Sequence, residues 1–218
     1  MRQNFRPPTP QRVSIDGPAG VLEARVEDPA SEPSPLAVGV VCHPHPLYGG
    51  TLQNKVVHTL ARAMQELGVP TLRFNFRGVA GSAGAYDGGA GEIEDAVAVC
   101  AWARSRWNQD ALWLAGFSFG AAVALQAAPF VRPRMLVTVA PPVGRLIVTP
   151  ISPPGCPWLV VQGDRDELVD CAAVRAWASG QPQPPVMLVL NDAEHFFHGR
   201  LGELRAGVID FLGTASAV

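Results

Sequence analysis

The stretch ALWLAGFSFGAAVALQAA, residues 111–128, joins an apolar run typical of a buried strand to a run of small apolar residues at 120–128. The second run predicts a helix that packs closely on a sheet. Ser118 lies between the two runs, with Gly116 and Gly120 two positions away on either side. A sharp turn there would expose the serine oxygen, and larger side chains at the glycine positions would collide with it. Ser118 is therefore the candidate nucleophile.

Two other interpretations of Ser118 arise from the same residues. The serine could simply cap the N-terminus of the helix. Gly116, Ser118 and Ala121 also loosely fit the G-x-G-x-x-A pattern of a dinucleotide-binding turn. That pattern is disfavoured because a side chain at the second glycine position would block the pyrophosphate, and because no acid ends the next strand.

The rest of the chain alternates between strand and helix patterns. Two short strands, RVSI and VLEARVE, are expected to form an antiparallel hairpin near the N-terminus. Further strands are expected at 36–42, 69–76, 111–117, 135–140, 158–163 and 186–190, and helices at 54–67, 92–107, 120–128, 171–178 and 201–212. This alternation predicts an α/β fold with a mostly parallel, doubly wound sheet and helices on both faces, in a single domain of residues 1–218. Ligands of such sheets bind beyond the carboxyl ends of the strands.

A serine hydroxyl needs a general base at neutral pH, and histidine is the usual one. The chain has five histidines, at positions 43, 45, 58, 195 and 198. His195 directly follows the last predicted strand and is the preferred base. His198 is expected to open the final helix instead.

The base in turn needs a carboxylate that fixes its tautomer. The segment GDRDELVD follows the strand at 158–163 and offers three aspartates. Asp166 is preferred because it lies further along the loop and can reach across to the histidine. Asp164 remains an alternative, and Asp170 is expected to cap the next helix.

Composition excludes several classes of function. The chain has 218 residues, a net charge of −2, 48% hydrophobic residues and 17% charged residues. Because no basic excess is present, we expect no nucleic-acid partner. No apolar run is long enough for a membrane span, and residues 1–12 lack the apolar core of a signal peptide. Four cysteines without a CxxC pair favour free thiols, so a cytoplasmic protein with no membrane partner is expected.

Metal and nucleotide sites are also disfavoured. His43 and His45 could form a metal pair, but no third ligand is spaced nearby, so no metal is expected. The glycine-rich segment 78–91 lacks the G-K-[ST] of a P-loop. Arg77 follows a strand, and a structural ion pair is its more plausible role.

The chain order Ser118, Asp166, His195 resembles that of the α/β-hydrolase superfamily. GFSFG is similar to the nucleophile elbow of that family, QGDRDELV to its acid loop and AEHFF to its histidine loop. The segments HPHPLYGGTLQNKVV and FNFRGVAGSAGAYDGGAGEIEDA resemble small bacterial hydrolases without a lid, distantly like dienelactone hydrolases. Dienelactone hydrolase uses a cysteine, so serine here favours a general esterase.

The resemblance implies a serine hydrolase that cleaves small to medium carboxylic esters (EC 3.1.1) through an acyl-enzyme, with no cofactor. A peptidase or thioesterase with the same three residues, or a binding module that kept the fold without catalysis, are the alternatives. We expect a small-molecule ester as partner; the sequence carries no signal for the oligomeric state.

The same resemblance implies an oxyanion hole made of backbone N–H groups. One donor is expected to be Phe119, directly after the serine. The second is expected in the loop 43–50, whose two prolines have no N–H. His45, Leu47 and Tyr48 remain, with His45 preferred and Leu47 next. Tyr48 is also expected to line the substrate pocket.

A cap domain commonly enters this fold between the strands expected at 135–140 and 158–163. The connection at 141–157 is short and rich in proline, which leaves no room for an independent lid. We therefore expect an open, shallow site.

Overall fold

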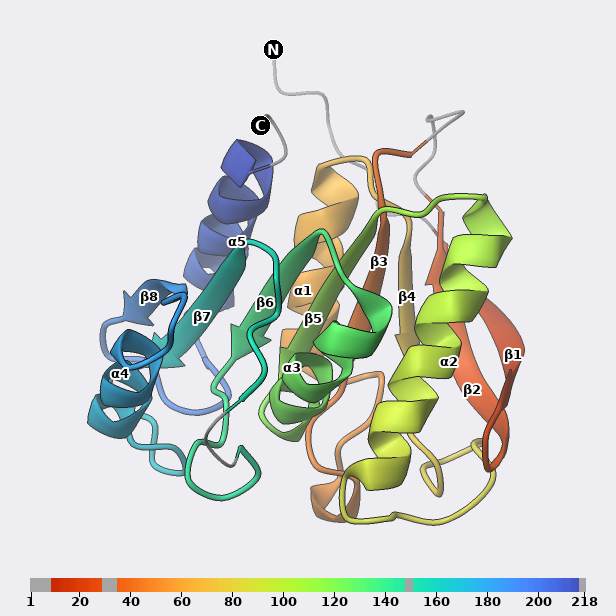
Figure 1. Cartoon of the computed structure of the whole chain (residues 1–218), viewed down its shortest axis with the longest axis horizontal. Coiled ribbons are helices and arrows are strands. Elements are labelled where there is room, and N and C mark those ends of the chain that lie inside the picture. Colours follow the sequence, from red (N-terminus) through yellow and green to blue (C-terminus); the bar gives the residue numbers. More distant parts are fainter. Residues whose placement is uncertain (1–8, 29–34, 148–150, 216–218) are drawn as a thin grey trace.

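The structure, a computed structural model, describes residues 9–28, 35–147 and 151–215 (Figure 1). Its strands are β1 (Gln11–Gly17), β2 (Gly20–Glu27), β3 (Val38–Cys42), β4 (Thr71–Phe74), β5 (Leu112–Phe117), β6 (Met135–Val139), β7 (Trp158–Gly163) and β8 (Val186–Leu190). Its helices are α1 (Lys55–Glu66), α2 (Ala90–Trp107), α3 (Phe119–Val131), α4 (Cys171–Ser179) and α5 (Leu201–Ala215), with a short 3-10 helix, η1 (Pro46–Tyr48). Within the described residues, none of the helices has the length and apolar character needed to cross a membrane.

The strands form one eight-stranded sheet in the order β1-β2-β4-β3-β5-β6-β7-β8. Strands β3 to β8 run parallel to one another, whereas β2 pairs in antiparallel fashion with both β1 and β4. The mostly parallel sheet and the N-terminal hairpin predicted from the sequence are thus confirmed. Strand β5 lies at the centre, with β3 on one side and β6 on the other.

Helices cover both faces of the sheet, as predicted. Helices α2, α3 and α4 lie on the face turned toward the viewer in Figure 1, and α1 and α5 lie behind it. The central strands are buried along their whole length because both faces are covered. Helix α3 is buried on nearly all sides, which its alanines and glycine permit.

Helix boundaries differ from the sequence expectation at a few points. Helix α3 continues through Pro129 to Val131, because a proline in the last turn costs only one helical hydrogen bond. His198 lies in a turn before α5, which begins at Leu201, so it does not open that helix. Asp170 caps α4, as expected: its carboxylate accepts the N–H of Ala173 at 2.6 Å.

The junction between β5 and α3 depends on two glycines. A Cβ atom on Gly116 would lie 2.0 Å from the carbonyl oxygen of Gly120. A Cβ atom on Gly120 would lie 2.4 Å from the carbonyl oxygen of Cys42 and 2.5 Å from that of His43. These neighbours are backbone atoms and cannot rotate away. Glycine at both positions therefore allows the first turn of α3 to touch the end of β3.

This contact predicts that two glycine substitutions change the free energy of unfolding by very different amounts. Gly116→Ala should lower the free energy of unfolding by about 2–4 kcal/mol, because α3 must move off the sheet. Gly202→Ala is the matched control, since no atom lies within 4 Å of its added methyl group. The control should be neutral or slightly stabilising, because alanine is the better helix former. Urea unfolding measures both, and equal free energies for the two variants would contradict this account of the junction.

Candidate active site

Ser118 occupies the turn between β5 and α3 with φ 53° and ψ −117°. A positive φ is uncommon for a non-glycine residue and costs of the order of 1–3 kcal/mol. Backbone hydrogen bonds hold the turn: the Ser118 N–H donates to Val139 at 2.8 Å, and its carbonyl accepts the N–H of Ala121 at 2.9 Å. The side chain makes no capping bond to α3. Ser118 thus occupies the N-cap position of α3, but its side chain does not cap the helix, and its hydroxyl is available for another partner.

That partner is His195. Its Nε2 lies 3.1 Å from the Ser118 Oγ, and its Nδ1 lies 2.8 Å from the Asp166 Oδ2. The three side chains come from the loops after β5, β7 and β8, so the structure joins the three sequence candidates in one hydrogen-bonded chain. His195 is 2% exposed, and its ring contacts those of Phe117 and Phe196. An ionised Asp166 accepts a hydrogen bond from the Nδ1–H of His195. In this tautomer the Nε2 lone pair faces the serine.

The surroundings of Asp166 favour its ionised form. Its Oδ1 accepts the backbone N–H groups of Leu168 at 2.9 Å and Val169 at 2.8 Å, and its Oδ2 also accepts from Gln162 at 2.9 Å. Burial acts to raise the pKa of Asp166, but the hydrogen bond and charge of His195, together with the two backbone donors, lower it below its usual range. The carboxylate is thus fixed in position and charge.

The other residues considered from the sequence lie elsewhere. Asp164 is exposed, and its side chain makes no hydrogen bond or ion pair in the described part of the chain. The His198 ring is exposed and contacts the carboxylate of Glu194. Neither residue takes part in the hydrogen bonds that join Ser118, His195 and Asp166.

Two supporting residues were not anticipated from the sequence. Gln162, which bonds Asp166, is a polar residue inside the apolar strand WLVVQG, and that contrast was an available signal. Glu167 accepts the backbone N–H of His195 at 3.2 Å through its Oε2. Nothing in the local sequence marks Glu167 for this role, because the contact joins two loops that only the fold brings together.

The loop after β3 contributes His45 to the pocket that contains Ser118. The N–H of His45, and that of Phe119 at the start of α3, donate to no acceptor among the described residues. The N–H of Leu47 already donates to the His45 Nδ1 at 3.2 Å, and that of Tyr48 donates to the His45 carbonyl at 3.1 Å. Of the candidates in this loop, His45 alone keeps a free donor, and Leu47 does not fit the role.

A pocket of about 510 Å³ opens over the serine. It is lined by His45, Tyr48, Ser118, Phe119, Pro142, Arg145, Leu146, Leu168, Val169 and His195. Tyr48 stands at its rim and is 85% exposed. The β6–β7 connection contributes Pro142, Arg145 and Leu146 and contains no helix or strand in the described residues 140–147 and 151–157. The pocket is mainly apolar and open.

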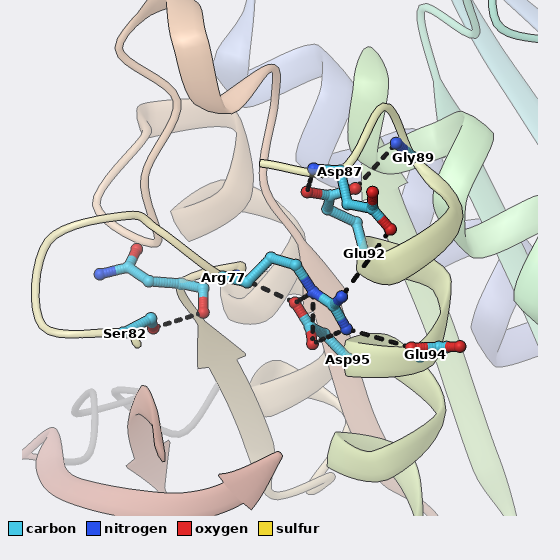
Figure 2. A network of polar contacts seen from close by, with 8 residues as sticks. Arg77, Ser82, Asp87, Gly89, Glu92, Glu94 and Asp95 are labelled. Carbon is cyan, nitrogen blue, oxygen red and sulfur yellow. Dashed lines mark hydrogen bonds and ion pairs between the residues drawn. The ribbon is translucent and has the colours of Figure 1, made fainter. Parts of the chain in front are cut away.

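The segment after β4 is fixed to α2 by a polar network (Figure 2). The Arg77 guanidinium binds Asp95 at 2.8 Å and Glu94 at 3.3 Å, and the buried Glu92 accepts the backbone N–H groups of Asp87 and Gly89. Arg77 is therefore a structural ion-pair residue, in line with the preferred sequence interpretation.

This anchored segment supports the pocket through Tyr86. The Tyr86 hydroxyl lies 3.4 Å from the His45 Nε2, and the two rings are 5.1 Å apart. The His45 ring also contacts those of Tyr48 and Phe119. Tyr86 lies in a glycine-rich stretch that gives no sequence signal for this contact.

His43 is fully buried and has a structural role. Its Nδ1 donates to the Pro44 carbonyl at 2.6 Å, and its Nε2 accepts the N–H of Phe76 at 3.0 Å. These bonds connect the ends of β3 and β4. No group of three metal-ligating side chains occurs in the part of the chain that the structure describes.

Comparisons with known proteins agree with this geometry. The family model "X-Pro dipeptidyl-peptidase (S15 family)" matches residues 16–147. The chain is 34% identical over 214 residues to an uncharacterized protein of Rickettsia prowazekii, covering 93% of this chain and 89% of that one. A lidless α/β serine hydrolase from Xanthomonas campestris is 42% identical, with a TM-score of 0.90 and 97% of each chain covered. An α/β serine hydrolase homologue from Coxiella burnetii is 46% identical, with a TM-score of 0.88 and coverage of 92% of this chain and 96% of that one.

The buried His43 predicts a pH dependence of stability. Burial lowers the pKa of His43 from 6.5 to about 4, although its bond to Pro44 opposes the shift. Between these values the unfolded chain binds a proton that the folded chain does not, so stability falls as pH falls. The loss from His43 between pH 7 and pH 4.5 should be about 2–3 kcal/mol.

The measurement compares urea unfolding at both pH values for wild type and His43→Gln, whose amide can still accept the Phe76 N–H. Carboxylates titrate in both proteins, so only the difference between them reports on His43. The variant should lose about 2–3 kcal/mol less than wild type. Equal losses would contradict a neutral, buried His43.

Proposed function

This chain belongs to the α/β-hydrolase superfamily, among the serine hydrolases without a lid, and from that premise we propose that it hydrolyses small to medium carboxylic esters. The observation that carries the proposal is the hydrogen-bonded chain from Ser118 through His195 to Asp166, which opens into the 510 Å³ pocket. A nucleophile, a base and an orienting carboxylate in this order form the arrangement that activates serine for acyl transfer.

In the proposed reaction, the Ser118 Oγ attacks the ester carbonyl while the His195 Nε2 takes the hydroxyl proton. His195 then gives this proton to the leaving alcohol, and an acyl-Ser118 intermediate remains. A water molecule next attacks the acyl group with His195 again as base, and the acid is released. Asp166 keeps the Nδ1 proton in place and stabilises the imidazolium that forms in each step.

The negative charge of each tetrahedral intermediate needs fixed donors. We assign this role to the backbone N–H groups of Phe119 and His45, which have no other acceptor among the described residues. Phe119 also opens α3, whose N-terminal dipole favours negative charge. Preorganised donors of this kind contribute about 3–4 kcal/mol each to transition-state stabilisation.

An X-Pro peptidase is the second candidate, favoured by the S15 family match. That match covers residues 16–147 and so does not reach Asp166 or His195. A dipeptidyl substrate brings an ammonium group, which a carboxylate would recognise. The described pocket lining offers Arg145 as its permanently charged side chain and no carboxylate. An ester without a positive charge therefore fits this pocket better.

The first test is labelling with a fluorophosphonate, read by intact-mass spectrometry. Wild type should gain one adduct near neutral pH, and Ser118→Ala should gain none, because only an activated serine reacts. Hydrolysis of p-nitrophenyl butyrate, of an acyl thioester and of an X-Pro p-nitroanilide should then show the ester to be the preferred substrate.

Two aspartate variants form the matched control. Asp166→Asn should lower kcat by roughly 10³–10⁴-fold, because the amide cannot hold the required tautomer. Asp164→Asn should leave kcat unchanged. Absence of an adduct on folded wild type would refute the hydrolase and favour a binding module, whereas preferential anilide or thioester cleavage would refute the ester assignment alone.

The oxyanion role of His45 has its own test. His45 has φ −54°, which proline can adopt, so His45→Pro removes the backbone N–H with little change in backbone conformation. His45→Ala keeps that N–H and removes only the ring. The proline variant should have a kcat about 10²–10³-fold below that of the alanine variant. If the two variants have equal kcat values, His45 is not the donor.

A further inference from the structure

Three arginines form a row across the antiparallel end of the sheet. Arg12 on β1 lies opposite Arg25 on β2, and Arg25 lies opposite Arg73 on β4. Residues in direct register across strands point to the same face of the sheet, and like charges in such positions are destabilising. A chain with a net charge of −2 thus concentrates positive charge on this face.

Only one end of this row is neutralised by the protein. Glu27 binds Arg73 at 2.7 Å, and Arg73 also donates to the Leu52 carbonyl at 2.6 Å. Neither Arg12 nor Arg25 has an ion pair within the described residues. The Arg25 Nε is buried and has no hydrogen-bond partner among the described residues. The charge of Arg25 is therefore not balanced by an ion pair in the described part of the chain, and a bound anion at its exposed nitrogens would balance it.

A pocket of about 280 Å³ lies beside this row. It is lined by Pro10, Arg25, Leu52, Gln53, His58 and Arg73. These residues do not overlap with the lining of the Ser118 pocket, so the two sites are distinct.

The pKa of His58 is affected by the arginines of this pocket. Its Nε2 lies 2.7 Å from the Arg73 Nη1. Burial lowers the pKa of His58, and Arg73, Arg62 and Arg25 lower it further, while Glu27 acts in the opposite direction. Among the charged groups that act on this imidazole, Arg73 and Arg25 thus lower its pKa and Glu27 raises it. Glu23, in the next cross-strand row, already accepts hydrogen bonds from other groups.

We propose that this pocket binds a phosphate group, held by Arg25 with Gln53 and His58 beside it. The planar guanidinium presents paired N–H donors that match phosphate oxygens, and such charge-assisted bonds are the strong ones. The phosphate group would offset the repulsion along the arginine row. The proposal does not depend on ester hydrolysis at Ser118.

The test is calorimetric titration with inorganic phosphate at constant ionic strength, maintained with sodium chloride. Wild type should bind one phosphate, and Arg25→Gln should weaken binding by roughly tenfold or more. Arg175→Gln removes an exposed arginine on α4, far along the sheet, and should bind as wild type does. Without phosphate, Arg25→Gln should be at least as stable as wild type, because it removes a like-charge contact.

Several results would overturn the proposal. One is that phosphate gives no heat of binding beyond that of the matched chloride titration. The others are that Arg25→Gln and Arg175→Gln weaken binding equally, or that acetate binds with the same affinity as phosphate. Arg12→Gln, on the exposed end of the row, gives an independent variant if Arg25→Gln does not fold, and it should weaken phosphate binding several-fold.

A titration with glycerol phosphate separates the two possible sources of the phosphate group. Tighter binding than inorganic phosphate indicates a phosphorylated metabolite, and weaker binding indicates the free ion. An upward shift in the NMR titration of the His58 imidazole on phosphate addition would support occupancy.

Discussion

The close contact between β5, α3 and the end of β3 is the constraint on which the rest of the structure depends. Gly116 and Gly120 allow backbone to meet backbone there, and Ser118 is forced into a turn with positive φ. The strain of this turn is offset by the hydrogen bond to Val139 on the neighbouring strand and by the first turn of α3. The position of the candidate nucleophile is thus set by the packing at the centre of the sheet.

The other parts of the site are held by different elements. Parallel strands bring the loops after β3, β5, β7 and β8 to one edge, and each loop contributes one group. Polar contacts then fix these groups: Gln162 orients Asp166, Asp166 orients His195, and Tyr86 contacts His45. Arg77 and Glu92 anchor the segment that carries Tyr86, so a network remote from the serine shapes the pocket wall.

Much of this was accessible from the sequence, because periodicity and glycine placement report on local structure. The strands, the hairpin and the turn at Ser118 follow from apolar runs and from the GFSFG spacing. Contacts between distant loops were harder to predict. Glu167 and Tyr86 act through residues 28 and 41 positions away, and no local pattern encodes such distances. The hydrogen bond from the Leu47 N–H to the His45 ring was not predicted for a different reason. The order of residue types does not show when a side chain accepts the N–H of a nearby residue.

The sheet also distributes stability unevenly across the site. Ser118 is tied to central strands that are buried along their length, whereas His195 follows β8, an edge strand whose Val186 is 57% exposed. Edge elements with few buried contacts open locally at lower free energy than the core. Local opening of β8 and its loop would therefore displace the imidazole while the serine turn stays folded. Heat or denaturant should therefore separate His195 from Ser118, and so abolish the reactivity of the serine, before it unfolds the turn that carries Ser118.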